Sequence, residues 1–129
     1  MVKFIISTNK RYELIDITDK VEESLQESKK EEGIVTIFVP HSTAAVLLTE
    51  NETNLKKDWV NFLKDKVKGY NFNHNKIDNN ADSHILSGLI GQTKVIPFEN
   101  GKLERGTWQQ IFLVELDGPR KRKLNVKII

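Results

Sequence analysis

The three histidines of the chain, His41, His74 and His84, are the first candidates for chemistry. His84 follows a run of carboxylate and amide side chains, Asp78–Ser83, and precedes a short apolar segment. Since the chain has no cysteine, a metal site would be a histidine site with an open position for substrate or water. The spacing matches no recognised metal motif, so hydrogen-bonded polar histidines remain the alternative.

Two carboxylates share predicted strand faces with apolar side chains. Glu50 follows Val46 and Leu48 in the strand alternation, and Glu115 continues the face of Leu113. A carboxylate on an apolar face usually has a partner or a raised pKa, so either residue is a candidate general base or metal ligand. A salt-bridged structural carboxylate is the alternative.

Two arginines enter the predicted last strand from its core side, because Arg120 and Arg122 alternate with Leu124. An unpaired buried charge is costly, so these guanidinium groups should meet either carboxylates or an anionic ligand. The planar arginine fork suits phosphate, which it binds through two oxygens. The alternative is an internal ion pair with Glu115 or Asp117.

Hydroxyl and amide groups complete the candidate set. Ser42 and Thr43 stand beside His41 and could offer hydroxyls to a phosphate. Gln109 has inward parity and needs a partner, while Trp108 is expected in the core. No Gly-x-Ser-x-Gly elbow is present, which argues against a serine–histidine nucleophile.

Apolar patterning predicts the elements that position these residues. Strands are expected at Val2–Ser7, Arg11–Ile17, Ile34–Val39, Thr43–Thr49, Thr93–Pro97, Trp108–Leu116 and Arg120–Ile129. Helices are expected from Thr18 with an Asp19–Glu22 capping box, from Asn51 to near Gly69, and from Asp78–Asn80 to Gly91. This order is typical of an α+β fold with a mainly antiparallel sheet.

Three connections in this pattern are specific enough to test. The first two strands look like a hairpin around Thr8–Lys10, and Asn100–Gly101 is a strong hairpin turn. Strands Ile34–Val39 and Thr43–Thr49 are apolar on both faces, and pairing them would place His41 at a bend between buried strands. Such two-sided burial suggests a two-layer sandwich or a subunit interface.

The totals bound the class of protein. A chain of 129 residues suits one domain, 1–129. The net charge of +2 is too small to indicate a nucleic-acid partner. No apolar run approaches the ~20 residues that span a bilayer, so no membrane partner is expected. The absence of cysteine is compatible with a cytoplasmic protein.

Several segments together resemble the YjbQ-like family. They are Pro40–Ala45, Thr49–Glu52, Ser83–Ile85, Glu115–Arg120 and above all Gly101–Ile111 with its Gly-Thr-Trp-Gln signature. The resemblance covers nearly the whole chain. It implies a small α+β domain with a β-sandwich core, assembled as a homotrimer, with His41, His74 and His84 in a metal or anion site. Many bacterial members read Glu-His where this chain reads Glu115-Leu116.

The activity that the resemblance implies is secondary thiamine-phosphate synthase, which joins a pyrimidine diphosphate to a thiazole phosphate and expels pyrophosphate. A divalent ion, zinc or magnesium, and an arginine would hold the leaving pyrophosphate. The alternative is a non-catalytic trimeric binding protein for a small anionic metabolite. The expected site residues are Glu50, Glu115 and His41 for catalysis; Ser42, Thr43, Gln109, Arg120 and Arg122 for phosphate; and His41, His74 and His84 for the metal.

Overall fold

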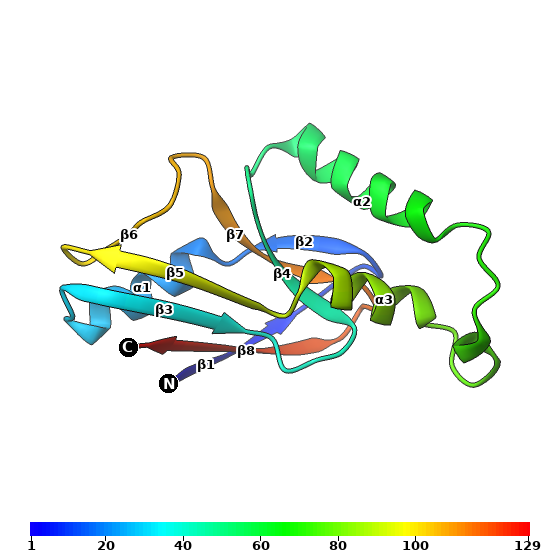
Figure 1. Cartoon of the computed structure of the whole chain (residues 1–129), viewed down its shortest axis with the longest axis horizontal. Helices are drawn as coiled ribbons and strands as arrows, with labels where there is room; N and C mark the ends of the chain where they lie inside the picture. The colour runs from blue at the N-terminus through cyan, green and yellow to red at the C-terminus, as the bar shows by residue number, and fades with distance from the viewer.

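Antiparallel strands form two sheets in the computed structural model, which describes residues 1–129 (Figure 1). The five-stranded sheet has the order β1-β8-β3-β5-β6 and the three-stranded sheet the order β2-β7-β4. The strands are β1 (Val2–Ser7), β2 (Glu13–Asp16), β3 (Glu32–Phe38), β4 (Ala44–Thr49), β5 (Thr93–Glu99), β6 (Lys102–Leu103), β7 (Gln110–Glu115) and β8 (Lys121–Ile128). The predicted α+β class with an antiparallel sandwich is confirmed.

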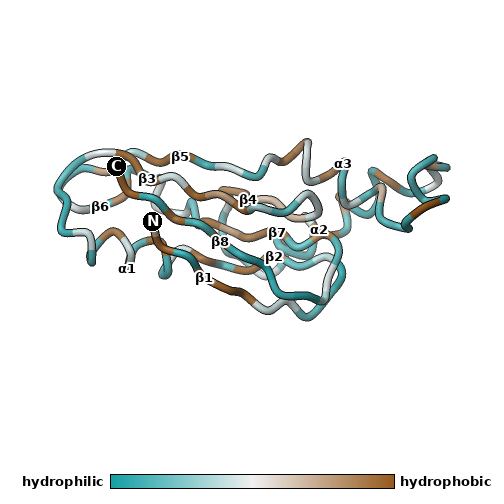
Figure 2. Tube along the Cα trace, turned by 90° about the horizontal axis from the view of Figure 1, so that it is seen from below, coloured by the Kyte–Doolittle hydropathy of each residue, from teal (hydrophilic) through white to brown (hydrophobic).

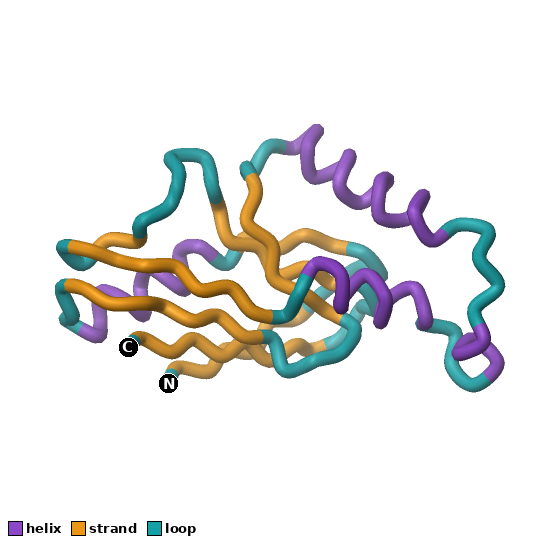
Figure 3. Tube along the Cα trace, viewed as in Figure 1, coloured by secondary structure: helices purple, strands orange, loops and turns teal.

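The helices close the sandwich on different sides. They are α1 (Thr18–Ser28), α2 (Thr53–Val67) and α3 (Ala81–Ile90), with a short 3₁₀ helix, η1 (Asn73–Lys76), before α3. Val21 and Leu25 of α1 join the main core between the two sheets. A second core lies on the other face of the three-stranded sheet, where Leu63 of α2 and Leu86 of α3 pack. Figure 3 shows α2 and the loop after it reaching away from the strands.

Strand alternation explains which side chains enter the core. In β8, Arg122, Leu124 and Val126 are buried, while Lys121 and Lys127 are exposed on the opposite face. Figure 2 shows hydrophobic segments concentrated along the strands and hydrophilic ones in the connecting loops. The outer face of the five-stranded sheet carries no helix, so the lysines of β8 are solvated there as the sequence predicts.

The predicted hairpin of the first two strands is wrong. β1 pairs with β8 and β2 pairs with β7, so the chain crosses from one sheet to the other between them. The crossing segment is bonded to the β7–β8 turn: Thr8 N donates to the Arg120 carbonyl at 2.9 Å, and Gly118 N donates to the Arg11 carbonyl at 3.1 Å. Long-range partners therefore override the local turn pattern.

The predicted pairing of the strands around His41 is also wrong, because β3 pairs with β5 and β8 while β4 pairs with β7. Two-sided burial is confirmed for β4, where Ala44 and Ala45 contact different cores. It fails for β3 in the single chain: Ile34 and Phe38 on its outer face are 37% and 42% exposed.

The helix ends differ from prediction in detail. The Asp19–Glu22 capping box does not form; Asp16 Oδ1 instead accepts from Thr18 N at 2.9 Å. Glu52 caps α2 by accepting from Leu55 N at 2.7 Å. The Asn100–Gly101 hairpin between β5 and β6 is confirmed, with φ of 52° and 70° that suit a tight hairpin turn. No helix of the structure has the length and apolar character to cross a bilayer.

Candidate functional site

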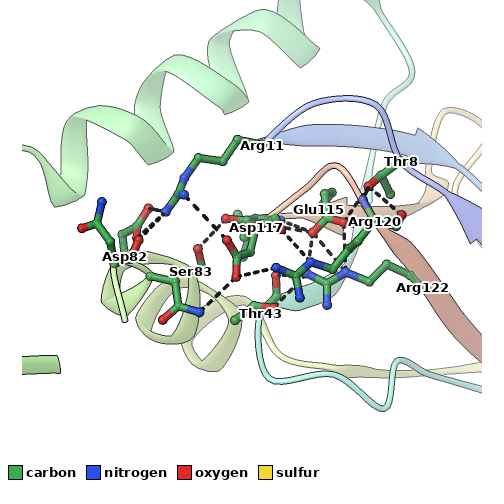
Figure 4. Close-up of polar contacts among 12 residues, drawn as sticks. Thr8, Arg11, Thr43, Asp82, Ser83, Glu115, Asp117, Arg120 and Arg122 are labelled. Carbon is green, nitrogen blue, oxygen red and sulfur yellow. Dashed lines mark hydrogen bonds and ion pairs between the residues drawn. The ribbon is translucent and has the colours of Figure 1, made fainter. Parts of the chain in front are cut away.

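A polar network lies at one end of the sandwich, where the β7–β8 turn meets α3 and the β1–β2 crossing (Figure 4). Two buried serines dock α3 there. Ser83 Oγ donates to the Leu116 carbonyl, and Ser87 Oγ donates to the Ala44 carbonyl, both at 2.5 Å. Because these bonds are buried, they fix the helix that carries His84 against β4 and β7.

The inner part of the network is a buried ion pair between Glu115 and Arg122, which are 0% and 2% exposed. Arg122 Nη2 lies 2.5 Å from Glu115 Oε2, and its Nε donates to Oε1 at 2.9 Å. Glu115 also accepts from Thr8 Oγ1 at 2.7 Å and from the Asp117 N–H at 3.0 Å. Of the two possibilities that the sequence left open, Arg122 forms the internal ion pair.

Burial raises the pKa of Glu115, but the Arg122 guanidinium, the Asp117 N–H and the Thr8 hydroxyl outweigh it and leave that pKa below its usual value of 4.5. A carboxylate so stabilised in its ionised form, with both oxygens occupied, has no lone pair directed at a substrate. Within one chain Glu115 is therefore occupied by internal partners, and the catalytic role stays a prediction.

Thr43 belongs to the same buried group. Its hydroxyl and its carbonyl both accept from Arg122 Nη2, at 2.8 and 2.9 Å, and the residue is 6% exposed. The predicted phosphate contact of Thr43 is therefore not available in this structure, and neither is that of Arg122. Ser42, its neighbour in the turn, is exposed and keeps a free hydroxyl.

The outer part of the network is centred on Asp117. Arg120 donates to the Asp117 carbonyl from Nε at 2.7 Å and to its carboxylate from Nη2 at 3.1 Å. Asn80 Nδ2 donates to the same carboxylate at 3.0 Å, and Arg11 Nη1 lies 3.7 Å from it. Arg120 is half-exposed, so it combines an internal partner with an open side.

Arg11 continues the network to Asp82, whose carboxylate lies 2.9 Å from Arg11 Nη2 and accepts from the Tyr12 hydroxyl at 2.5 Å. Burial raises the pKa of Asp82, but the hydrogen bonds from Tyr12 and Arg11 lower it by a larger amount. The pKa therefore lies below its ordinary value and the carboxylate stays ionised. Burial and the Asp82 contact raise the pKa of Tyr12 well above its ordinary value. Tyr12 is therefore a hydrogen-bond donor at neutral pH.

Two of the three histidines meet at the edge of this network. The rings of His74 and His84 pack edge to face with centroids 5.0 Å apart. His74 Nε2 lies 2.8 Å from Asn80 Oδ1, and Asn80 links it in turn to Asp117. Asn80 is the N-cap residue of α3, within the predicted helix start, but its side chain is used in this way and makes no capping hydrogen bond.

His41 lies in the connection between β3 and β4, where it is bonded to β8. Its Nε2 accepts the Lys123 N–H at 2.8 Å, which is the backbone donor that β3 leaves unpaired after Phe38. Desolvation, with the positive charge of Arg122, lowers the pKa of His41 below 6.5. The ring is thus neutral at pH 7, and since Nε2 is an acceptor, the proton is on Nδ1.

The predicted histidine metal site is not assembled in a single chain, because no group of three histidine, aspartate or glutamate side chains is placed to hold an ion. The rings of His74 and His84 contact each other, but His74 Nε2 is bonded to Asn80 Oδ1 and His41 Nε2 to the Lys123 N–H. Since a metal site of this kind needs at least three protein ligands, the donors of one chain alone do not make up a site for a divalent ion.

Glu50 and Gln109 lie where the sequence did not place them. Glu50 follows the end of β4 and is exposed. Gln109 is exposed rather than inward, and its Oε1 accepts from Gly106 N at 2.8 Å. Trp108 is 71% exposed and does not lie in the core as predicted. It stands on a loop that is closed by hydrogen bonds between Gly106 and Gln109. This signature loop precedes β7, so it lies at the opposite end of that strand from Glu115.

Sequence reasoning missed Thr8, Arg11, Tyr12 and Asp82 as members of the network. Asp82 belongs to the polar stretch before α3, but its partners come from the segment for which the sequence predicts a hairpin. One signal was present: Gly118 follows Asp117 in a turn, and a Cβ on Gly118 would lie 2.3 Å from the Lys10 carbonyl oxygen. Only glycine allows the two segments to approach so closely.

The comparisons with known proteins agree with this fold. The family model of UPF0047 protein YjbQ-like matches residues 2–129. A UPF0047 protein of Methanocaldococcus jannaschii is 45% identical over 131 residues, covering 100% of this chain and 94% of that protein. YugU of Bacillus subtilis is 36% identical, covering 96% and 95%. The crystal structure of a YbjQ-like protein from Sulfolobus solfataricus matches with a TM-score of 0.96 at 44% identity, covering 98% and 94%.

Proposed function

This chain belongs to the YjbQ-like UPF0047 family, and we propose that it binds a small phosphorylated molecule at the surface around His41, Ser42 and Arg120. The observation that carries the proposal is the hydrogen bond from Lys123 N to His41 Nε2. It fixes the ring so that Nδ1–H is a neutral donor. A fixed donor of this kind suits an anionic oxygen better than a metal ion or a proton.

The neighbouring groups support an anionic ligand. Arg120 uses Nε and Nη2 on Asp117, and its Nη1 makes no bond within the chain. The charge of Arg120 is among those that lower the pKa of His41, after desolvation and the larger effect of Arg122. Ser42 adds an exposed hydroxyl beside them. These groups offer a phosphate a cation and two neutral donors.

The more specific proposal is the thiamine-phosphate synthase reaction that the resemblance implies. In that reaction the bond to pyrophosphate breaks as the thiazole nitrogen forms a bond to the pyrimidine methylene carbon. Arg120, His41 and Ser42 would stabilise the negative charge that grows on the leaving pyrophosphate, which is electrostatic catalysis by preorganised donors. The enclosed Glu115–Arg122 pair would hold the Thr43 end of the His41 turn in place.

A non-catalytic binding protein for a small anionic metabolite is the second candidate. It is favoured by the state of the two carboxylates, since Glu115 is fully occupied and Glu50 is exposed beyond the end of its strand. Neither is placed as a general base within one chain.

A homotrimer in the cytoplasm is part of the proposal. The outer face of β3 leaves Ile34 and Phe38 partly exposed, although the sequence pattern of this strand is that of one covered on both faces. A second copy of the chain would supply that cover. Light scattering on the purified protein would test the trimer, and a monomer at micromolar concentration would remove it.

Calorimetric titration with pyrophosphate and with thiamine phosphate tests binding. We expect His41→Ala and Arg120→Ala each to weaken it by about tenfold or more, because each removes one charged or fixed donor. His74→Ala is the matched control and should bind as the wild type does. Equal affinity in all four proteins would overturn the site.

A synthesis assay with the two phosphorylated substrates then separates the two candidates. Thiamine phosphate formed at a rate that falls in His41→Ala favours the enzyme. Tight binding without product, in protein with and without added zinc or magnesium, favours the binding protein.

A further inference from the structure

A second surface carries positive charge that the proposed function does not use. A cleft of about 760 Å³ lies between α2 and the segment from Lys10 to Leu14. It is lined by Lys10, Arg11, Lys56, Lys57 and Lys64, with Glu13 as its one acidic residue. We refer to these six residues and the space between them as the basic cleft.

The charge of the basic cleft is largely unneutralised. The four lysines form no ion pair within 4 Å and no side-chain hydrogen bond, whereas Arg11 is paired with Asp82. Glu13 is occupied by the Asn9 N–H at 2.9 Å. Setting Arg11 aside, four lysines and one glutamate leave a net charge of +3 there, more than the +2 of the entire chain. The remainder of the protein is therefore close to neutral, and the cleft attracts anions.

The helix supplies its share of these charges from one face. Lys56, Lys57 and Lys64 line the cleft together with Val60 and Asn61, at the spacing of one side of α2. From Lys56 to Lys64 the helix rises by about 12 Å, and from Thr53 by about 17 Å. The span from Lys56 to Lys64 matches on the order of four stacked nucleotides at a ~3.4 Å rise. The lysines therefore suit a row of phosphates better than a single one.

An aromatic platform adjoins the cleft. A second cavity of about 240 Å³ shares Arg11 with it and is lined by Tyr70 and Phe72. The two rings are stacked, with centroids 5.4 Å apart and an interplanar angle of 6°. Tyr70 is 66% exposed, so this residue is accessible to a ligand. Stacking on such a ring accepts any base, since every base has a π-face.

We propose that the basic cleft binds a single strand of nucleic acid, with its phosphates along Lys10, Lys56, Lys57 and Lys64 and a base stacked on Tyr70. Charge complementarity selects a polyanion, and the adjoining aromatic pair selects one that carries bases. The sequence predicts no nucleic-acid partner, because the net charge is only +2. That total does not reveal that several lysines converge on one surface. This site is separate from the His41 surface, and its test does not depend on the proposed function.

Fluorescence anisotropy on the full chain tests the proposal, with fluorescein-labelled oligothymidylate and oligouridylate of about ten nucleotides as probes. We expect log K to fall with log salt at a slope of about −3, since four lysines contribute roughly 0.7 each. The Lys56→Gln/Lys57→Gln double variant should make the slope shallower by about 1.4. Lys121→Gln/Lys127→Gln removes the same charge from the outer face of β8 and should leave the slope unchanged.

The aromatic contact has its own matched pair of variants. Tyr70→Ala should weaken binding by about five- to a hundredfold, and Tyr70→Phe, which keeps the ring, should bind as the wild type does. Inorganic polyphosphate at the same phosphate concentration should compete poorly. The proposal is overturned if polyphosphate displaces the strand as efficiently as unlabelled oligonucleotide and Tyr70→Ala has no effect, or if both double variants change the slope equally. Tighter binding of uridylate than thymidylate, or the reverse, identifies the strand as RNA or DNA.

Discussion

The side chains of Glu115 and Arg122 at the β7–β8 turn are buried and paired, whereas most of the lysines in the basic cleft are exposed and unpaired. Glu115 and Arg122 are almost fully buried, and every oxygen of the carboxylate has a donor. Lys10, Lys57 and Lys64 are exposed and have no carboxylate within 4 Å. The difference teaches that charge satisfied inside the protein holds the fold, whereas charge left unsatisfied at a concave surface is available for a ligand.

Arg122→Met gives the largest effect, because it leaves a buried carboxylate without its cation. The free energy of unfolding should fall by about 3–5 kcal/mol in urea denaturation. Adding Glu115→Leu should restore most of that loss, since a buried pair is often replaced by apolar residues at little cost. Arg120→Met, whose ion pair is half-exposed, is the control and should cost under about 1 kcal/mol. Similar losses of unfolding free energy in Arg122→Met and Arg120→Met would show that burial of the ion pair makes no difference.

Gly118→Ala tests the close approach beneath the pair. The new Cβ would lie 2.3 Å from the Lys10 carbonyl oxygen and 2.8 Å from Glu115 Cγ, so the turn must move. We expect a loss of about 1–3 kcal/mol, measured by thermal or urea unfolding. Gly88→Ala in α3 meets no atom within 4 Å and should stabilise the protein by about 0.5–1 kcal/mol. A Gly118→Ala protein as stable as the wild type would refute the packing described.

Acid should weaken the turn through the same carboxylate. Because the folded pKa of Glu115 lies below 4.5, its contribution is present above that pH and is lost as pH falls through the folded pKa. Stability should therefore decline below about pH 4.5, with Asp82 adding to the decline below about 3.8. In Glu115→Gln, unfolding midpoints plotted against pH should be lower overall but flatter in this range. An equally steep curve would assign the acid sensitivity to other groups.

His41 sets a smaller pH effect at the open side of the network. Its folded pKa is below 6.5, so stability is full above that value and declines as pH falls from 6.5 to the folded pKa. Proton NMR of the ring should show a midpoint below 6.5, and His41→Gln should remove the slope in this range. A midpoint above 6.5 would mean that the ring does not accept the Lys123 N–H in the neutral form.

The smallest effect is expected in the basic cleft. Lys57→Gln and Lys64→Gln should each change the free energy of unfolding by no more than about 0.5 kcal/mol, because neither side chain has a partner to lose. Urea titrations beside the wild type would check this. A loss of 1 kcal/mol or more would show that these lysines stabilise the fold and are not free for a ligand.

The sequence predicts the elements of this fold better than their pairing. Periodicity identifies α2 from Leu55, Leu63 and Val67, and parity places Arg122 on the core side of β8. Periodicity carries no information on which strands become neighbours, so the partners of β1, β3 and β4 were missed. Both errors concern contacts between residues distant in the chain.

The sequence predicts the candidate site only where a side chain lies within a strand and obeys the alternation of inward and outward residues. The Glu115–Arg122 ion pair was among the alternatives because both residues have inward parity. Trp108 and Gln109 have the same apparent regularity, yet β7 begins at Gln110, so alternation does not apply to them. The basic cleft cannot be predicted from the sequence pattern, because Lys10 and Lys57 come together only in the tertiary structure.

The position of β8 has a consequence for how the chain reaches this structure. It lies between β1 and β3, although it follows all the other strands in sequence, and Val2 is paired with Val126. During synthesis β1 therefore stays without a partner until the residues of β8 have been made. Arg122 arrives with the same strand, so Glu115 is uncompensated until then. The pairing of β1 and β3 with β8 and the polar network should consequently form together in one late, slow step, because both depend on contacts between distant parts of the chain.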